Sequence, residues 1–332
     1  MFCPCLYLRI WLNIDEKFWE FMKKAAAFLL SILILSPCMV SAQNTYDFLR
    51  LDMSARAGAL AGSFVSNDDD PNVIFYNPAG LDMLEGQPVS FSFVKHLLDI
   101  NLASLSYSRE FEGIGRFGAA VKYINYGTFT GADDVGNKTE DFGAGEVAFI
   151  IGYANELDEN FYYGANVKFI YSGIEKRSST GLAADLGLHY AIPSAMVDIG
   201  FAALNMGSQL TTYYNTRESL PLDIVIGISK RLENLPVRLS LDFHKLNENR
   251  DEFSQRFKAF TVGAEFNLSK VVSLRFGYDN EKRSELKVGT TAGIAGFNAG
   301  LGLVISDYTF DYGFSSLGTI GALHRISVAT TF

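Results

Sequence analysis

Beyond residue 42 the sequence contains no cysteine. Its three cysteines, Cys3, Cys5 and Cys38, all lie in the first 38 residues. A chain that loses this end can form no disulfide and offers no thiol as a nucleophile or a metal ligand. A disulfide framework and a cysteine-dependent enzyme are therefore excluded for residues 43–332.

The sequence also lacks an excess of positive charge. It has 28 Lys and Arg against 37 Asp and Glu, a net charge of −9, and loss of the first 42 residues, which hold four basic and three acidic side chains, would make this −10. Binding to a phosphate backbone requires a basic surface, so nucleic acid is not expected as a partner. Long apolar runs are missing too, because no charge-free stretch after residue 42 approaches the roughly 20 residues that a membrane helix needs.

The amino end has the three parts of a secretory signal peptide. Met22-Lys23-Lys24 is basic, residues 25–35 are apolar, and Val40-Ser41-Ala42 has the small residues of a cleavage site. This order predicts a signal peptide over residues 22–42, cleaved after Ala42. Residues 1–21 are interpreted as an upstream extension from a start codon placed too early. A lipoprotein signal at Cys38 is the alternative, disfavoured because Pro37 stands where a small residue should precede the lipidated cysteine.

The sequence is rich in aromatic residues and glycine, with 27 Phe, 16 Tyr and 30 Gly against 8 Pro. From Pro88 onward apolar and polar residues alternate. In residues 237–244 every second residue is apolar, and the polar residues between them include Arg238, Asp242 and His244. A period of two predicts strands with one apolar and one polar face. Strands that face lipid and carry aromatic girdles have this composition.

The alternation predicts fourteen strands. They lie near 88–95, 101–111, 115–126, 142–154, 160–172, 179–191, 195–205, 221–231, 235–246, 255–267, 270–279, 297–305, 307–314 and 322–332. A further candidate, 286–294, alternates poorly, and we assign it to an outer loop because single-chain bacterial barrels have even strand numbers. Long and short connections are expected at opposite ends, as outer loops and periplasmic turns. The predicted fold is all-β, a 14-stranded antiparallel transmembrane β-barrel over residues 88–332.

The last predicted strand has apolar residues at Ile326, Val328 and Phe332. In lipid the last strand of a barrel must pair with the first, so that no edge stays open. We expect these three residues to form the barrel-assembly signal. The expected partners are then the barrel assembly machinery and outer-membrane lipid.

A barrel of fourteen strands is wider than its own side chains can fill. Residues 43–87 precede the first strand and combine small residues with turns. We predict that they form an N-terminal hatch inside the lumen. The residues expected to pack this hatch are Arg56, Gly58, Gly62, Asn77, Pro78, Ala79, Gly80 and Leu81.

No pattern of catalytic residues stands out, so we predict that the protein is not an enzyme and has neither a metal nor a cofactor. The polar side chains expected to face the lumen are Lys168, Arg238, Asp242, His244 and Arg275. Asp242 and His244 share a strand face with Arg238, which is typical of the acid–base part of a hydrolase. No serine motif accompanies them, so a polar lumen wall held by charge pairs is favoured.

The acidic run Asp68-Asp69-Asp70 could bind calcium. It lacks the spaced ligands, the glycine and the distal Glu of a calcium loop. A solvated turn is the favoured interpretation. Asn77–Leu81 is interpreted as structural, with a role in gating as the alternative.

Two segments resemble the PorV/PorQ family. Residues 54–62, then Asp69-Asp70-Pro71 and residues 74–81 (Ile-Phe-Tyr-Asn-Pro-Ala-Gly-Leu), look like the amino-terminal region of that family, and Leu323–Val328 resembles its last strand. The Asn-Pro-Ala-Gly-Leu motif is also similar to that of the wider FadL-like barrels. The resemblance implies a hatch-plugged barrel in the outer membrane of a Gram-negative bacterium of the Bacteroidota.

For PorV and PorQ the resemblance implies a part in type IX protein secretion. The protein would bind, shuttle or attach cargo at the cell surface, with secretion-system subunits and secreted cargo proteins as partners. FadL-like relatives instead carry hydrophobic small molecules across the outer membrane. Secretion is the prediction, and FadL-like transport is the alternative.

Overall fold

The computed structural model describes residues 44–332 except 134, 249–252 and 288–292. The predicted upstream extension and signal peptide therefore lie outside the described residues. None of the helices in the described residues is long and apolar enough to cross a membrane.

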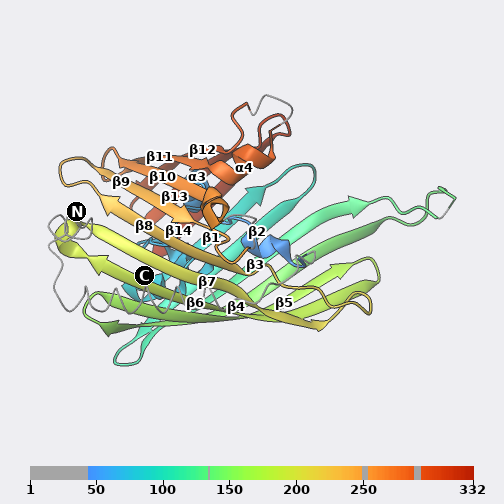
Figure 1. The fold of residues 1–332 in the computed structure, drawn as a ribbon, viewed down its shortest axis with the longest axis horizontal. Helices are drawn as coiled ribbons and strands as arrows, with labels where there is room; N and C mark the ends of the chain where they lie inside the picture. The colour runs from blue at the N-terminus through green and yellow to red at the C-terminus, as the bar shows by residue number, and fades with distance from the viewer. Residues whose placement is uncertain (1–43, 134, 249–252, 288–292) are drawn as a thin grey trace. The chain divides into compact units, whose positions relative to one another are not determined.

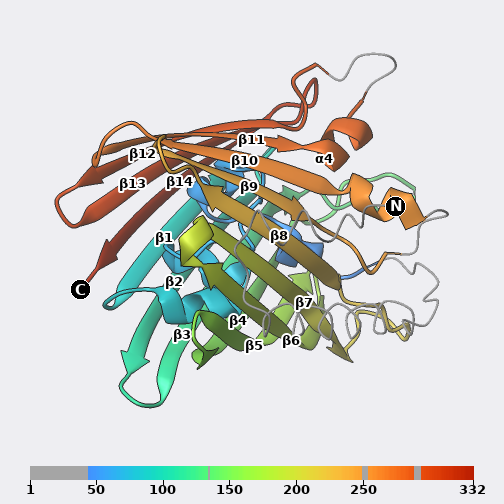
Figure 2. The same cartoon turned by 60° about the vertical axis from the view of Figure 1, so that its left-hand side comes forward.

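Fourteen antiparallel strands form one closed barrel, in which each strand pairs with its neighbours in sequence and β14 pairs with β1 (Figures 1 and 2). The strands are β1 (Pro88–Lys95), β2 (Asn101–Phe111), β3 (Gly115–Phe129), β4 (Phe142–Asp158), β5 (Phe161–Ile174), β6 (Arg177–Ile192), β7 (Val197–Thr211), β8 (Asp223–Arg231), β9 (Val237–Phe243), β10 (Phe260–Asn267), β11 (Val272–Asp279), β12 (Phe297–Ile305), β13 (Tyr308–Ser316) and β14 (Ala322–Thr331). The predicted fold class and strand number are confirmed.

The alternation in sequence places polar side chains on the inner face of the barrel and apolar side chains on its outer face. On β9, Arg238, Ser240 and Asp242 are buried, whereas Leu239 between them is 43 % exposed. Exposed aromatic rings lie along the end with short turns, where Phe117 contacts both Phe111 and Tyr153. Apolar side chains facing out and polar ones facing in are what a transmembrane barrel requires.

The structure corrects the start of one predicted strand and agrees with the loop predicted at 286–294. Residues Phe253–Lys258 form the 3₁₀ helix η5, so β10 begins at Phe260, opposite Phe243. The pairing with β9 ends at Phe243. The backbone of residues 253–258 has no strand partner there and forms hydrogen bonds within the 3₁₀ helix instead. Helix α4 (Asn280–Glu285) precedes the candidate 286–294, whose described residues contain no strand.

The connections also differ from the prediction. Most long connections share one end of the barrel, here called the outer end. Strands β5 and β6, however, are joined at this end by only Glu175 and Lys176. The two strands are long and continue the wall outward.

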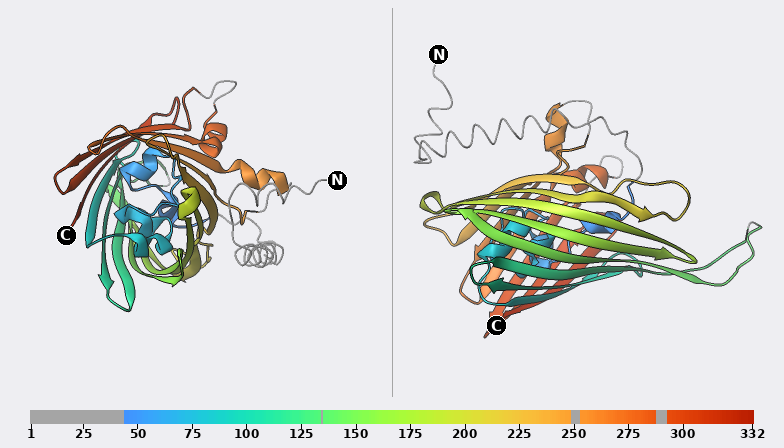
Figure 3. Two further views of the ribbon diagram at one scale, coloured as in Figure 1. Left: turned by 90° about the vertical axis from the view of Figure 1, so that its left-hand side faces the viewer. Right: turned by 90° about the horizontal axis from the view of Figure 1, so that it is seen from below.

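Residues 44–87, here called the luminal segment, lie inside the ring of strands (Figure 3, left). The segment contains η1 (Asp47–Arg50), α3 (Ala55–Ala59), η2 (Pro71–Phe75) and η3 (Pro78–Met83). Ser54, Asp70 and Asn77 each cap the helix that follows by accepting a hydrogen bond from a backbone N–H of its first turn. Proline begins η2 and η3, where no backbone N–H is needed.

Glycines in the wall let the backbone of this segment approach closely. A Cβ at Gly277 would lie 2.5 Å from the backbone nitrogen of Ala61, and one at Gly200 would lie 2.2 Å from the backbone oxygen of Val65. Both contacts are far inside van der Waals distance, so each position has room only for hydrogen. The wall and the segment are thus fitted backbone to backbone.

Candidate functional site

The candidate functional site is the lumen, where the luminal segment meets the wall. Helix α3 places Arg56 against β10, and its Nε and Nη2 donate to the two carboxylate oxygens of Glu265 at 3.0 and 2.7 Å. Nη1 of Arg56 lies 2.8 Å from Oδ1 of Asp69. Glu265 also accepts from Nε of Arg275 at 2.6 Å, and Arg275 pairs with Asp311 on β13. The predicted hatch residue Arg56 and the predicted lumen residue Arg275 therefore share one carboxylate.

The acidic turn at 68–70 is only partly solvated: the Asp69 side chain is 48 % exposed, whereas Asp70 is buried. Its carboxylates also face arginines. Arg238 lies 2.9 Å from Asp68 and 3.2 Å from Asp69, and Arg231 also pairs with Asp68. Asp70 is 5 % exposed and caps η2. The turn is thus an ionic clamp between the luminal segment and strands β8 and β9. The described residues hold no group of His, Cys, Asp and Glu suited to a metal ion.

The clamp determines how the segment responds to acid. Desolvation alone would raise the pKa of Asp69, but the Arg56 and Arg238 guanidinium groups outweigh it and hold this pKa well below its usual range. Burial raises the pKa of Asp70, so on acidification that carboxyl takes up a proton first. A lowered carboxyl pKa adds stability above the unfolded value of about 4, and this stability is lost as the pH falls through the lowered pKa.

We therefore expect the ion pairs of Asp69 to hold the lumen as closed at about pH 5 as at about pH 8, since both values lie above the lowered pKa of that carboxyl. Closure should weaken only in strongly acidic solution. Ion conductance of the protein in planar bilayers, recorded across this range, measures it. A conductance that rises between about pH 8 and pH 5 would show that the Asp69 clamp does not hold the segment.

Asp242 and His244 do not form an acid–base pair. Oδ2 of Asp242 accepts hydrogen bonds from the backbone nitrogens of Phe64 and Val65 at 2.7 and 2.9 Å. His244 follows the end of β9, with Nδ1 3.8 Å from Asp223 and Nε2 3.3 Å from Oγ1 of Thr261. Burial alone would lower the pKa of His244, but the Asp223 carboxylate raises it. Asp242 therefore positions the luminal segment.

Two buried lysines line the other side of the lumen. Nζ of Lys168 contacts Asp185 at 2.8 Å and donates to Oδ1 of Asn205 at 2.7 Å. Lys122 donates to the backbone oxygens of Leu49 and Leu51 at 2.8 and 2.6 Å. Lys122 is not among the predicted lumen residues, although its place in the alternation of β3 points it inward.

The other predicted hatch residues lie at contacts of the segment. Asn77 donates from Nδ2 to the backbone oxygens of Val65 and Leu188 at 2.8 and 3.0 Å. Gly62 has a φ of +78°, and a Cβ at Gly58 would lie 2.6 Å from the Arg325 side chain. Pro78, Ala79, Gly80 and Leu81 are buried in η3.

The predicted assembly residues are more exposed than the predicted hatch residues. Ile326 is 55 % exposed and Phe332 is 77 % exposed, and Val328 is half-buried. Phe332 exchanges backbone hydrogen bonds with Gln87, just before β1. Their role in assembly stays a prediction.

Near the outer end the inner wall is apolar, which the sequence analysis did not foresee. The inward residues of six neighbouring strands form one cluster, here called the apolar luminal patch: Val94, Leu102, Ile124, Ala148, Ile170 and Ala183. Tyr46, Phe48, Leu49 and Met53 of the luminal segment cover it and are all buried. A space of about 60 Å³ remains beside the segment, bordered by Leu51, Tyr76 and the two lysines.

Comparisons with known proteins show the fold. No family model matches the sequence, and no curated protein does. The toluene transporter TbuX of Ralstonia pickettii superposes with a TM-score of 0.58 at 13 % identity, over 84 % of this chain and 98 % of TbuX.

Two further solved structures are similar. A FadL homologue of Pseudomonas aeruginosa gives a TM-score of 0.54 at 11 % identity, over 89 % of this chain and 99 % of that one. The toluene transporter TodX of Pseudomonas putida gives 0.55 at 12 % identity, over 84 % of this chain and 98 % of TodX. None of these comparisons supports the resemblance to PorV and PorQ. The chain has the fold of the FadL-like outer-membrane barrels.

Proposed function

We propose that this protein carries hydrophobic small molecules across the outer membrane. The apolar luminal patch is the observation that supports this most directly. Porin interiors, which enclose water, are polar, whereas this wall presents an apolar surface to the luminal segment. A hydrophobic solute gains free energy by covering such a surface, at roughly 25 cal/mol per Å² of apolar area.

The luminal segment covers the apolar luminal patch and leaves little free space beside it. Solute pockets usually enclose about 300–1,000 Å³, whereas the space beside the luminal segment has about 60 Å³. Tyr46 and Phe48 occupy the patch in place of a solute. Binding thus requires that residues 44–53 move, and their contacts compete with the solute for the same surface.

The similarity in fold agrees with this proposal, since the solved structures include two toluene transporters. No observation favours the role in type IX secretion, which stays a prediction together with its partners. Deletion of the gene separates the two functions. Lost uptake of a hydrophobic compound with normal secretion supports transport, whereas cargo stranded in the periplasm would contradict it.

Replacing Phe48 by Ser is expected to strengthen the binding of a hydrophobic probe. Phe48 is 1 % exposed against the apolar luminal patch, so the substitution removes a competitor for that surface. The apparent affinity should rise by about tenfold or more, because a binding-competent state becomes more populated. Fluorescence titration of the purified protein with N-phenylnaphthylamine measures it.

The matched control is Phe91→Ser, which removes the same ring from the outer surface of β1, where it is 50 % exposed. This variant should bind the probe as the parent does. Ile124→Asp, which places a charge in the patch, should weaken binding. Equal affinities in all four proteins would show that solutes do not bind at the patch.

A further inference from the structure

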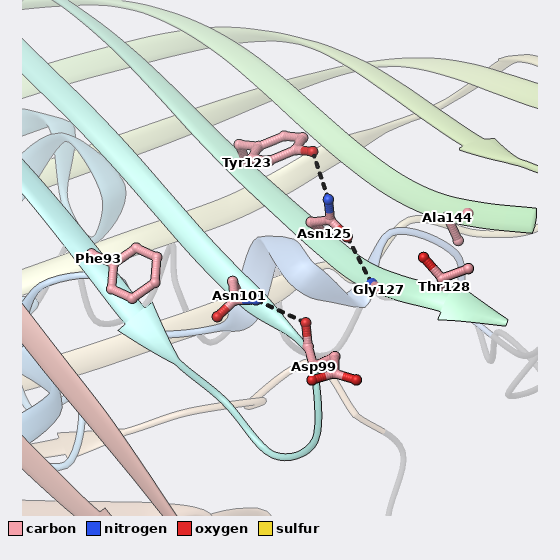
Figure 4. A pocket seen from close by; sticks show the side chains of 9 residues that line it. Phe93, Asp99, Asn101, Tyr123, Asn125, Gly127, Thr128 and Ala144 are labelled. Atoms are coloured by element: carbon pink, nitrogen blue, oxygen red, sulfur yellow. Dashed lines mark hydrogen bonds between the residues drawn. The ribbon is translucent and has the colours of Figure 1, made fainter.

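The outer wall has a hollow near its outer end, outside the lumen. It lies over β1 to β4 and has a volume of about 720 Å³ (Figure 4). Strand β3 has a bulge here, since Asn125 pairs with Gly145 but Thr128 pairs with Gly143. The bordering residues are exposed or half-buried, and none belongs to the apolar luminal patch or to the luminal segment. The hollow is therefore separate from the proposed transport site.

The hollow lies at the boundary between the apolar belt and the outer solution. One row of paired, outward residues crosses five strands at this height: His324, Lys95, Asn101, Asn125 and Gly145. The row below it is apolar and includes Phe93, Ala103 and Tyr123. From the aromatic girdle at Phe117 to Asn125, β3 has about the nine residues with which a tilted strand crosses the hydrocarbon core.

The side chains around the hollow can bind a sugar ring. Phe93 and Tyr123, 40 % and 42 % exposed, offer aromatic surface at its lower border. Asn101, Asn125 and Thr128 supply both donors and acceptors, which a ring of hydroxyl groups requires.

Two of these polar side chains are oriented by hydrogen bonds to the backbone, and two other polar groups at the hollow can bind a ligand. Asn101 donates to the backbone oxygen of Asp99 at 2.8 Å, and Asn125 accepts from the backbone nitrogen of Gly127 at 2.7 Å. Within the described part of the chain, the Asp99 carboxylate and the Thr128 hydroxyl have no hydrogen-bond partner among these residues (Figure 4). Asp99 would repel a phosphate in the hollow, so the hollow fits the uncharged part of a headgroup. The exposed Lys95 beside it fits an acidic group.

We propose that the hollow binds the sugar headgroup of a glycolipid of the outer leaflet. The acyl chains of such a lipid lie against the apolar belt, with which the hollow is continuous. Its sugar then reaches the height of Asn101 and Asn125, and its acidic group reaches Lys95. A lipid held there would cover β1 to β4 beside the bulge.

The experiment measures lipid binding to the purified full-length protein in detergent by native mass spectrometry. Rough lipopolysaccharide is compared with phosphatidylglycerol and with the delipidated core oligosaccharide. We expect lipopolysaccharide to bind at least about tenfold more tightly than either, since two or more hydrogen bonds and the acyl contacts are then made together.

Gly143→Trp is designed to fill the hollow. A Cβ at Gly143 meets only the backbone oxygen of Gly127, at 3.7 Å, so the substitution leaves the strand undisturbed. Gly173→Trp is the control, because it places the same ring outward on β5, outside the hollow, with its nearest contact at 3.4 Å. Asn101→Ala with Thr128→Ala removes polar partners without adding bulk.

Binding of lipopolysaccharide should fall about tenfold in Gly143→Trp and in the double variant, and stay unchanged in Gly173→Trp. Heat-modifiable migration on a gel verifies that each variant is folded. Equal binding of the phospholipid, or loss of binding in Gly173→Trp as well, would contradict recognition of a sugar at this hollow. Equal binding of the free oligosaccharide would contradict a membrane-anchored ligand.

Discussion

Deletion of residues 44–80 is expected to turn a closed barrel into an ion-conducting pore. Fourteen strands enclose more space than their side chains fill, and the luminal segment occupies that space. Its residues include Met53, Phe64 and Ile74, each no more than 1 % exposed. Without them the inner wall presents charged side chains such as Glu265 and Asp242 to water. Conductance in planar bilayers should rise by at least about tenfold, because the lumen then resembles a porin channel.

Deletion of residues 132–138 is the matched control. The described residues of this range lie at the tip of the β3–β4 connection, where Ala132 bridges to Lys138 away from the lumen (Figure 1). The shortened loop should leave conductance unchanged. If the barrel without residues 44–80 still folds and stays as closed as the parent, the luminal segment is not a plug.

The strands could be predicted because the polarity of each residue indicates which face of its strand it occupies. A period of two in residues 237–244 is visible locally, and β9 has that alternation. The error at residues 255–259 has a different origin. Their sequence alternates as well, but the strand needs a partner, and the partner ends at Phe243. Local pattern cannot show where a neighbouring strand stops.

The contacts within the lumen could be predicted only in part. That Arg238 and Asp242 face inward follows from alternation, but their partners in the luminal segment lie about 170 residues away in sequence. The sequence alone favours a solvated turn at Asp68, because nothing near it in sequence is basic except Arg56. The apolar luminal patch could have been predicted from the alternation, since Ile124 and Ile170 occupy inward positions of their strands.

Replacing Arg56 by Leu is expected to release the luminal segment from the wall. Arg56 is 9 % exposed and is the cation nearest to Glu265, Asp69 and Asp70 within that segment. Its loss leaves Asp70 without its arginine, whereas Glu265 keeps Arg275 and Asp69 keeps Arg238. Breaking a buried ion pair costs up to about 3–5 kcal/mol. The segment should become sensitive to added protease, and conductance should rise toward that of the barrel without residues 44–80.

Arg56→Lys and Arg109→Leu make this test specific. Lysine keeps the charge but cannot bind both oxygens of Glu265, so it should give an intermediate result. Arg109 is exposed on β2 over the ring of Phe111, and its loss should change neither conductance nor protease sensitivity. If Arg56→Leu stays closed and resistant to protease, the hydrogen bonds that Asp242 accepts and Asn77 donates suffice to hold the segment. Solute binding would then have to displace those bonds rather than the ionic clamp.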